Sequence, residues 1–222
     1  MKILSTILET IFPTQCIFCN TKGSELCAKC LYLSPSAERE SANWIFPLFD
    51  YRYPPIKKSI WFLKYKGKKR IATIFAEVMY IRIIEELSDK KIFENFQKPI
   101  LIPIPLASKR YRERGFNQST LICEALIKLD KNQPAYTDNN FTLEKNILIK
   151  PKDTKHQAHI EDRNKRLKNI IGSFAIIHPE LVVERNIILI DDVTTTGATL
   201  NEARKILKNA GAKKIIAFTI AH

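Results

Sequence analysis

One segment limits the fold of this chain more than any other, because it joins a wholly apolar run to a polar loop. Residues 187–190 are apolar at every position, which is typical of a strand buried on both faces of a parallel sheet. Asp191 and Asp192 follow directly, then a loop rich in threonine and an expected helix over 198–210 that Gly211 closes. In open α/β sheets, ligands bind at the carboxyl ends of the strands. The segment therefore predicts an α/β fold with a binding site after this strand.

Apolar spacing elsewhere predicts the other elements of such a fold. We expect strands over 100–105, 147–150 and 213–220, and helices over 3–12, 71–87 and 117–129. Asn117 and Ser119 are both candidate caps for the last of these helices. Because strands alternate with helices along the chain, the pattern implies a parallel sheet covered by helices.

Four of the five cysteines form a compact pattern: Cys16, Cys19, Cys27 and Cys30. Each pair has the spacing Cys-x-x-Cys, which lets two thiolates reach one ion, and four thiolates complete the tetrahedral shell that structural zinc prefers. Gly23 permits a turn between the pairs. Four unrelated thiols are the alternative interpretation. Since such a shell leaves no open coordination position, the expected zinc is structural.

A segment rich in serine, proline and charge, residues 33–43, indicates a linker. We therefore expect a small zinc-ribbon-like module over 1–45 and an α/β domain over 46–222. Cys123 lies in an expected helix as a small buried hydrophobe. No apolar run approaches the roughly 20 residues of a membrane span, and no secretion signal is recognisable, so we expect a cytoplasmic protein.

The positive charge is concentrated in three segments. The chain has 36 Lys and Arg against 23 Asp and Glu, a formal net charge of +13. The excess lies in residues 57–70, 109–114 and 145–168. Such segments attract polyanions, which include phosphorylated metabolites, nucleic acid and anionic membranes, although lysine-rich stretches are often only solvated faces.

The chemistry of the segment after residue 190 is that of a phosphorylated sugar site. A loop of small and hydroxyl-bearing residues at a helix N-terminus offers backbone N–H groups to a phosphate. Asp191 and Asp192 would repel that phosphate, but they suit the neutral hydroxyls of a ribose or a bound Mg²⁺. A ribose 5-phosphate moiety satisfies both halves, whereas an ordinary strand-turn-helix leaves the acid pair unexplained.

This segment resembles the signature that binds phosphoribosyl pyrophosphate (PRPP) in the phosphoribosyltransferase fold. A second segment, from residue 101 to 119, is similar to that of the competence protein F family, which includes ComFC and GntX-type proteins. The resemblance implies that Mg²⁺ accompanies PRPP and that the ligand is bound by Asp191, Asp192, Val193, Thr194, Thr195, Thr196, Gly197, Ala198, Thr199, Pro105 and Leu106. It also implies that Lys109, Arg110 and Arg112 are catalytic and meet the departing pyrophosphate.

The resemblance extends over nearly the whole chain. The cysteines match the zinc module of that family, and residues 49–67 resemble its opening segment. Thr154, Gln157, Arg166 and residues 169–174 resemble its flexible loop. Lys150 stands where Arg is expected, and Thr195 stands where purine-base transferases place an acidic general base. The second departure weakens the case for a purine-base acceptor.

The basic segments hold more positive charge than one PRPP molecule requires. Aromatic residues interleave with them, which favours a groove for single-stranded DNA with cations for phosphates and rings for base stacking. The candidate DNA-binding residues are Lys64, Tyr65, Lys66, Lys68, Lys69, Arg70 and Arg114. For Trp61 and Phe116, packing in the core is the favoured interpretation.

The leading functional hypothesis is a PRPP-binding, phosphoribosyltransferase-like protein that takes part in single-stranded DNA uptake during natural competence. That role comes from the resemblance, as does a contact with the DNA-uptake machinery. The alternatives are a conventional small-molecule phosphoribosyltransferase and a non-catalytic regulator that senses PRPP. The sequence leaves the acceptor nucleophile, the oligomeric state and the sharing of one cleft by DNA and PRPP undetermined.

Overall fold

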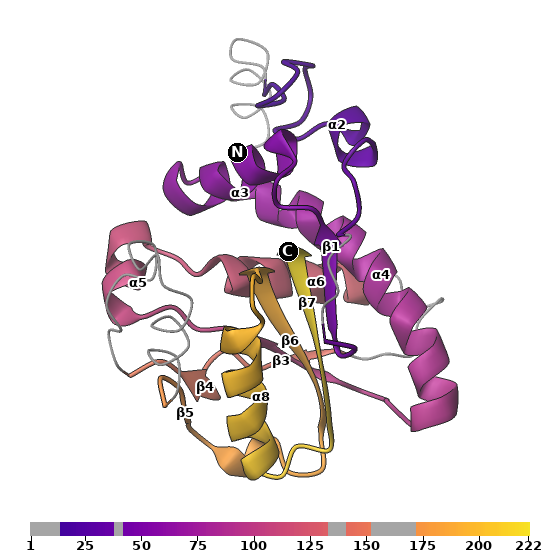
Figure 1. The fold of residues 1–222 in the computed structure, drawn as a ribbon, viewed down its shortest axis with the longest axis vertical. Coiled ribbons are helices and arrows are strands. Elements are labelled where there is room, and N and C mark those ends of the chain that lie inside the picture. The colour runs from indigo at the N-terminus through magenta and orange to yellow at the C-terminus, as the bar shows by residue number, and fades with distance from the viewer. Residues whose placement is uncertain (1–13, 38–41, 133–140, 152–171) are drawn as a thin grey trace.

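The computed structural model describes residues 14–37, 42–132, 141–151 and 172–222 (Figure 1). The helix expected over 3–12 lies outside these residues, as do Thr154, Gln157 and Arg166. The described elements are α2 (Ala28–Tyr32), β1 (Ile45–Phe49), α3 (Pro54–Tyr65), α4 (Arg70–Glu94), β2 (Ile100–Pro103), α5 (Ser108–Arg114), α6 (Gln118–Asn132), β3 (Thr142–Leu143), β4 (Leu148–Ile149), β5 (Ala175–Ile176), the 3-10 turn η2 (Pro179–Leu181), β6 (Asn186–Val193), α8 (Ala198–Asn209) and β7 (Lys214–Ala221).

A five-stranded parallel sheet forms the centre of the molecule, with strand order β1-β7-β6-β2-β3. From β2 the chain moves outward to β3, whereas from β6 it moves the other way to β7. The order of strands therefore reverses between β2 and β6, and the loops after these two strands open side by side at the carboxyl edge. The expected α/β class with a parallel sheet is confirmed.

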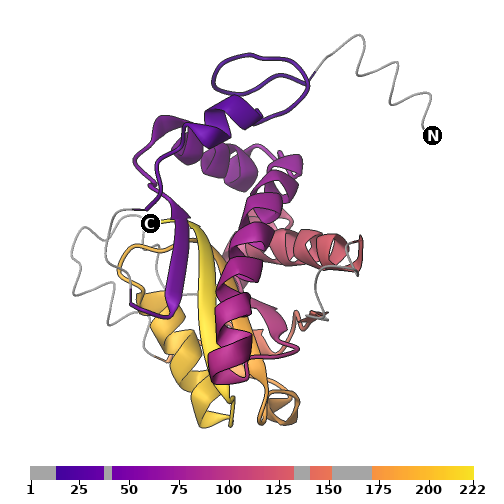
Figure 2. The same cartoon turned by 90° about the vertical axis from the view of Figure 1, so that its right-hand side faces the viewer.

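The alternating residues of β6 explain why this strand is apolar throughout. Ile188 and Ile190 belong to the core on the side of α4 and α6, while Ile187 and Leu189 pack with the residues of α8. Figures 1 and 2 show α8 on one face of the sheet and α4 on the other. Each helix layer thus buries one side of the same strand.

The helices and strands predicted within the described residues are present, with some differences in their bounds. The helix expected over 71–87 extends to Glu94, and Asn117 is the cap of α6, because its Oδ1 accepts the backbone N–H of Ser119 at 3.0 Å. The strand expected over 147–150 is present as β4, but it pairs antiparallel with β5 outside the main sheet. The spacing of apolar residues does not predict β1, α3 or α5.

The cysteine segment packs against α3 rather than standing alone. Cys16, Cys27 and Cys30 share one hydrophobic cluster with Ile56 and Ile60 of α3. Figure 1 shows α2 beside α3 above the carboxyl edge of the sheet. Among the described residues, none of the helices combines the length and the apolar character that crossing a membrane would require.

Candidate functional site

The paired acids end β6 at the point where the strand order reverses. The Asp192 carboxylate is buried and forms an ion pair of 2.8 Å with Lys64 of α3. Asp191 accepts hydrogen bonds from the Ser119 hydroxyl at 3.3 Å and from the backbone N–H of Asp192 at 2.8 Å. Strand, α3 and the start of α6 therefore meet at the acid pair, and Lys64 and Ser119 hold its geometry.

Burial sets the charge balance of this pair. It raises the pKa of Asp191 to about 7, and the negative charge of Asp192 adds to the effect. For Lys64, burial acts to lower the pKa, but the charge of Asp192 and their hydrogen bond outweigh it, so that the pKa is raised. Lys64 therefore remains protonated beside the acids and partly neutralises them.

The loop after the acids leads into the N-terminus of α8. The N–H of Thr194 bonds the carbonyl of Ala221 at 2.9 Å, which anchors the loop to β7. Gly197 has a φ of 70°, and a Cβ there would lie 3.2 Å from the Ile45 side chain, so both backbone and space favour glycine. Gly197, the N-cap residue of α8, has no side chain to cap the helix, and the Ala198 N–H donates a long hydrogen bond of 3.4 Å to the Thr196 hydroxyl. The backbone N–H groups at the start of α8 and the exposed hydroxyls of Thr195 and Thr196 can bind an anion.

The loop after β2 brings a second set of residues to the same edge. Pro105 and Leu106 are half-buried in it, and Asn117 donates a hydrogen bond of 2.9 Å to the Ile104 carbonyl. The Ile104 N–H in turn bonds the Ile190 carbonyl at 2.9 Å, which ties this loop to β6. The two loops predicted to share a ligand are therefore neighbours.

The three cations predicted to be catalytic all lie on α5, in different settings. Arg110 is half-buried, whereas Lys109 and Arg112 are exposed. Burial lowers the pKa of Lys150, the charge of Arg110 lowers it further, and the charge of Asp191 opposes this. Arg110 and Lys150 are thus close enough to each other to interact, and Lys150 also interacts electrostatically with Asp191.

The candidate DNA-binding residues divide into two groups. Lys64 is turned into the acid pair, and Lys68 forms an ion pair of 3.3 Å with Glu25, which is buried. Tyr65 is exposed and the half-buried Arg114 lies beside it: the guanidinium lies 5.0 Å from the ring centroid and donates a hydrogen bond of 3.3 Å to the phenol oxygen. Lys66 lies over Trp61 at 5.3 Å, Lys69 over Phe116 at 5.0 Å, and Arg70 is 3.5 Å from the Thr14 hydroxyl.

The expectation of core packing is wrong for Trp61. Its side chain is 45% exposed, because the inward face of α3 carries Ile56, Ile60 and Leu63, and position 61 lies away from that face. Its ring centroid lies 6.0 Å from that of Tyr65. For Phe116 the expectation is confirmed, since its half-buried ring packs against the core.

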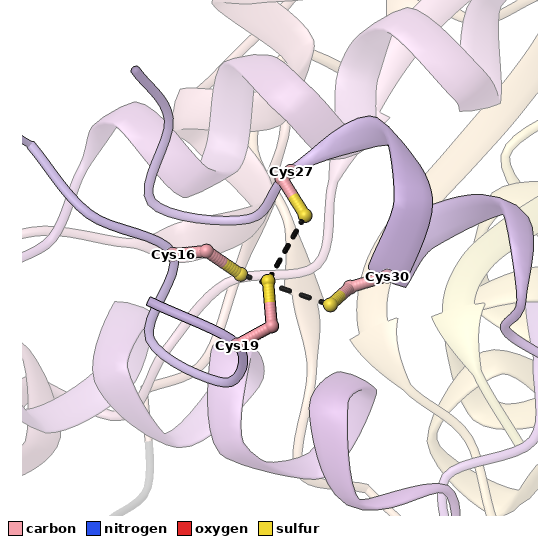
Figure 3. Close-up of side chains that lie close together, drawn as sticks. All are labelled: Cys16, Cys19, Cys27 and Cys30. Atoms are coloured by element: carbon pink, nitrogen blue, oxygen red, sulfur yellow. Dashed lines mark hydrogen bonds between the residues drawn. The ribbon is translucent and has the colours of Figure 1, made fainter. Parts of the chain in front are cut away.

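The four cysteines converge as the spacing predicts. Their Sγ atoms all lie within 4.8 Å of one another, with Cys19 to Cys27 at 3.4 Å and Cys16 to Cys30 at 3.8 Å (Figure 3). Sulfurs on a zinc ion with bonds of about 2.3 Å are separated by roughly 3.8 Å in a tetrahedron. This geometry fits one metal ion held by four thiolates.

Local backbone bonds create this convergence. The Cys16 N–H bonds the Thr21 carbonyl at 2.8 Å, and Gly23 turns the chain with a φ of 104°. The hydroxyl of Thr21 lowers the pKa of Cys19 to about 6, whereas burial raises that of Cys30. A divalent ion would favour the thiolate at every position. Cys123, outside the cluster, is fully buried in α6 as expected.

Comparison with known proteins identifies the relatives of this chain. A family model for the phosphoribosyl transferase domain matches residues 155–222. The DNA utilization protein YhgH of Shigella flexneri is 28% identical over 211 residues, which cover 93% of this chain and 82% of that protein. Competence protein F of Haemophilus influenzae is 29% identical over 214 residues, 92% of this chain and 84% of that protein. The chain is a homologue of competence protein F. The resemblance expected from the sequence is thereby confirmed.

The matched phosphoribosyl transferase domain contains the acid pair and its loop. Among solved structures, a hypoxanthine phosphoribosyltransferase from Trypanosoma cruzi aligns with a TM-score of 0.42 at 12% identity, over 68% of this chain and 64% of that one. That TM-score is too low for the alignment to support a statement about the site.

Three residues of this competence protein F homologue are shown to be near the acid pair only by the tertiary structure: Ser119, Lys64 and Lys150. The sequence predicts a helix cap at Ser119 and a DNA contact at Lys64, and it marks Lys150 only as a departure from the pattern of the family. No local signal distinguishes these residues, because each reaches the acids from a different element.

Proposed function

We propose that this protein binds PRPP together with Mg²⁺ at the carboxyl end of β6. The observation that carries the proposal is the acid pair, Asp191 and Asp192, next to the uncapped N-terminus of α8 at the reversal of strand order. The acids suit the ribose hydroxyls, and the loop of Thr194 to Thr199 suits the 5-phosphate. Both carboxylates also fit Mg²⁺, which prefers oxygen ligands and would neutralise charge on the pyrophosphate.

We further propose that the protein is a phosphoribosyltransferase. In this reaction, the bond from the anomeric carbon to pyrophosphate breaks with its electron pair on the pyrophosphate oxygen, while an acceptor nucleophile bonds to the carbon. Pro105 and Leu106 border the pyrophosphate. Lys150 interacts electrostatically with Asp191 and with Arg110, which places both cations on this side of the site, and Lys109 and Arg112 add to the positive field of α5.

The surface group formed by exposed Trp61, Tyr65 and Lys66 with half-buried Arg114 supports binding of single-stranded DNA. Aromatic rings stack on bases of any sequence, and adjacent cations contact phosphates. The names of the relatives, DNA utilization protein and competence protein, supply the physiological setting. We therefore propose a role in handling single-stranded DNA during natural competence, in the cytoplasm and near the DNA-uptake machinery.

We propose zinc as the ion of the four-cysteine cluster. Four convergent thiolates fit a closed tetrahedral site, and such a site stabilises structure without taking part in the reaction. The division into a module over 1–45 and a domain over 46–222 is part of the same proposal. The cluster shares its hydrophobic environment with α3, so the module would support the domain that follows it.

Thermal unfolding with PRPP and Mg²⁺ tests the central proposal. Ligand at about 100-fold over its Kd should raise the melting temperature by roughly 5 °C or more, because it binds only the folded state. Asp191→Asn and Asp192→Asn should each lose most of this shift. Glu77→Gln, an exposed position on α4, removes one negative charge elsewhere and should keep it. Equal shifts in all four proteins would remove the acid pair from the site.

A further inference from the structure

A hollow lies at the opposite edge of the sheet from the acid pair. Its volume is about 250 Å³, and its lining residues come from the start of β7 and from the last turns of α4 and α8. Figure 1 shows these ends of the three elements at its lower side. The polar lining consists mainly of Trp44, Lys90, Glu94, Arg204, Lys208 and Lys214. None of these residues has a role in the proposed reaction.

The charges around this hollow do not balance. Four cations line it with a single carboxylate, Glu94, which pairs with Lys90 at 3.4 Å and with Lys214 at 3.1 Å. Lys208 donates a hydrogen bond to the Lys213 carbonyl. Each lysine thus has a partner within the protein, yet the lining keeps a large positive excess.

Arg204 is the cation for which the described residues offer no acceptor. Its guanidinium lies over the indole of Trp44 at 4.5 Å, and Trp44 is only 7% exposed. The Nε of Arg204 is buried without a hydrogen-bond partner in the described part of the chain. Because this atom is shielded from solvent, a ligand in the hollow that Arg204 lines would have to meet the terminal Nη groups of the guanidinium and not Nε.

The helix dipole does not account for Arg204. Cations near a helix C-terminus are favoured within the last turn, which explains Lys208, one residue before the end of α8. Arg204 lies more than one turn earlier. Stacking on Trp44 instead holds the planar guanidinium in one orientation, and a fixed fork of donors is the form of arginine that recognises phosphate.

We propose that this hollow binds a small phosphate-bearing anion through Arg204. Its volume lies below that of sites for drug-sized ligands, so it suits inorganic phosphate or a small phosphate monoester rather than a DNA strand. The site is separate from the acid pair, because α8 and β7 each have one end at the hollow and the other near Thr194 and Gly197. It does not depend on the proposed reaction.

Fluorescence of Trp44 provides a test that is specific to this site. The chain has two tryptophans, so Trp61→Phe leaves Trp44 as the one indole reporter. Inorganic phosphate, titrated at constant ionic strength with KCl, should change its emission in a saturable way. In the same background, Arg204→Gln should weaken the apparent affinity by roughly tenfold or more. Lys205→Gln removes the same charge from an exposed neighbour and should leave it unchanged.

A second variant keeps the test valid should Arg204→Gln fail to fold. Lys208→Gln preserves the stacking on Trp44 and should weaken phosphate binding several-fold. A titration with glycerol 3-phosphate distinguishes the two sources: saturation with both ligands supports a monoester site, and saturation with inorganic phosphate alone supports a free-ion site. A response absent in the parent, or equal in the Arg204, Lys205 and Lys208 variants, would overturn the proposal.

Discussion

At the scale of single residues, the acid pair combines the attraction of Lys64 for Asp192 with repulsion between the two carboxylates. Asp192 has the Lys64 ammonium at 2.8 Å, whereas the hydrogen bonds of Asp191 within the described residues come from two neutral donors, the Ser119 hydroxyl and a backbone N–H. Burial makes ionisation of Asp191 unfavourable, and repulsion from the Asp192 carboxylate adds to this cost. Asp191 therefore titrates near neutrality, with a pKa of about 7.

The titration of Asp191 predicts a dependence of stability on pH. Its pKa in the unfolded chain is about 4, so between about pH 4 and pH 7 the folded state keeps a proton that the unfolded state has lost. The free energy of unfolding from this group consequently falls as the pH rises through that window. Asp191→Asn should raise the melting temperature by a few degrees at pH 8 and leave it unchanged below pH 4.

Melting curves of the parent and Asp191→Asn from pH 3.5 to pH 8 would check this prediction. Glu77→Gln serves as the control for loss of one negative charge. A gain that is the same at every pH would show that the carboxyl group of Asp191 is not the source of the effect.

At the scale of elements, α3 contributes to the core, to the acid pair and to the exposed surface. Ile56, Ile60 and Leu63 pack in the core, Lys64 reaches the acid pair, and Trp61 with Tyr65 remains exposed. One helix therefore joins the proposed PRPP site to the proposed DNA surface. The next segment along the chain carries Lys66 over Trp61, which extends the surface outward.

Binding of single-stranded DNA across a salt series tests this surface. If about four phosphates are neutralised, the plot of log K against log salt should have a slope of about −3. Trp61→Ala with Tyr65→Ala should weaken binding by roughly tenfold or more with little change in slope, because stacking releases no counterions. Lys66→Gln with Arg114→Gln should make the slope shallower.

Tyr32→Ala is the matched aromatic control, since Tyr32 is 90% exposed on α2 and outside this group. It should bind as the parent does. A flat salt dependence, or equal losses for the Tyr32 and the Trp61/Tyr65 variants, would contradict the assignment of the DNA surface.

At the scale of the whole molecule, the four-cysteine cluster supports the elements beside the acid pair. Cys16, Cys27 and Cys30 continue the core that holds α3, and the Lys68–Glu25 ion pair ties the module to the turn before α4. The cluster packs against α3, and Lys64 of α3 contacts Asp192. Loss of the metal should therefore weaken ligand binding at the acid pair.

Metal analysis tests this connection. We expect about one zinc ion per chain in the parent and none after Cys16→Ser with Cys19→Ser, because two ligands cannot hold the closed site. The same variant should melt several degrees lower and bind PRPP more weakly. Cys123→Ala lies outside the cluster and should retain the metal. Full zinc content in the double variant would refute the cluster.

The sequence by itself determined the local features of this protein. The apolar run before Asp191, the cysteine spacing and the helical periodicities each depend on residues close together along the chain, and the α/β sheet and the convergent thiols follow from them. Short edge elements such as β1 carry too little periodicity to be predicted. In α3, the lysines and aromatic residues between the buried positions obscure the helical spacing of its apolar residues.

Only the tertiary structure decided which distant side chains complete the site. Lys64 meets Asp192 from 128 positions away, and Ser119 meets Asp191 from 72. The same holds for Arg204 and Trp44 at the opposite edge, which belong to no common motif. Such pairs depend on the packing of whole elements against the sheet, and their energies come from burial and charge, which a local pattern does not encode.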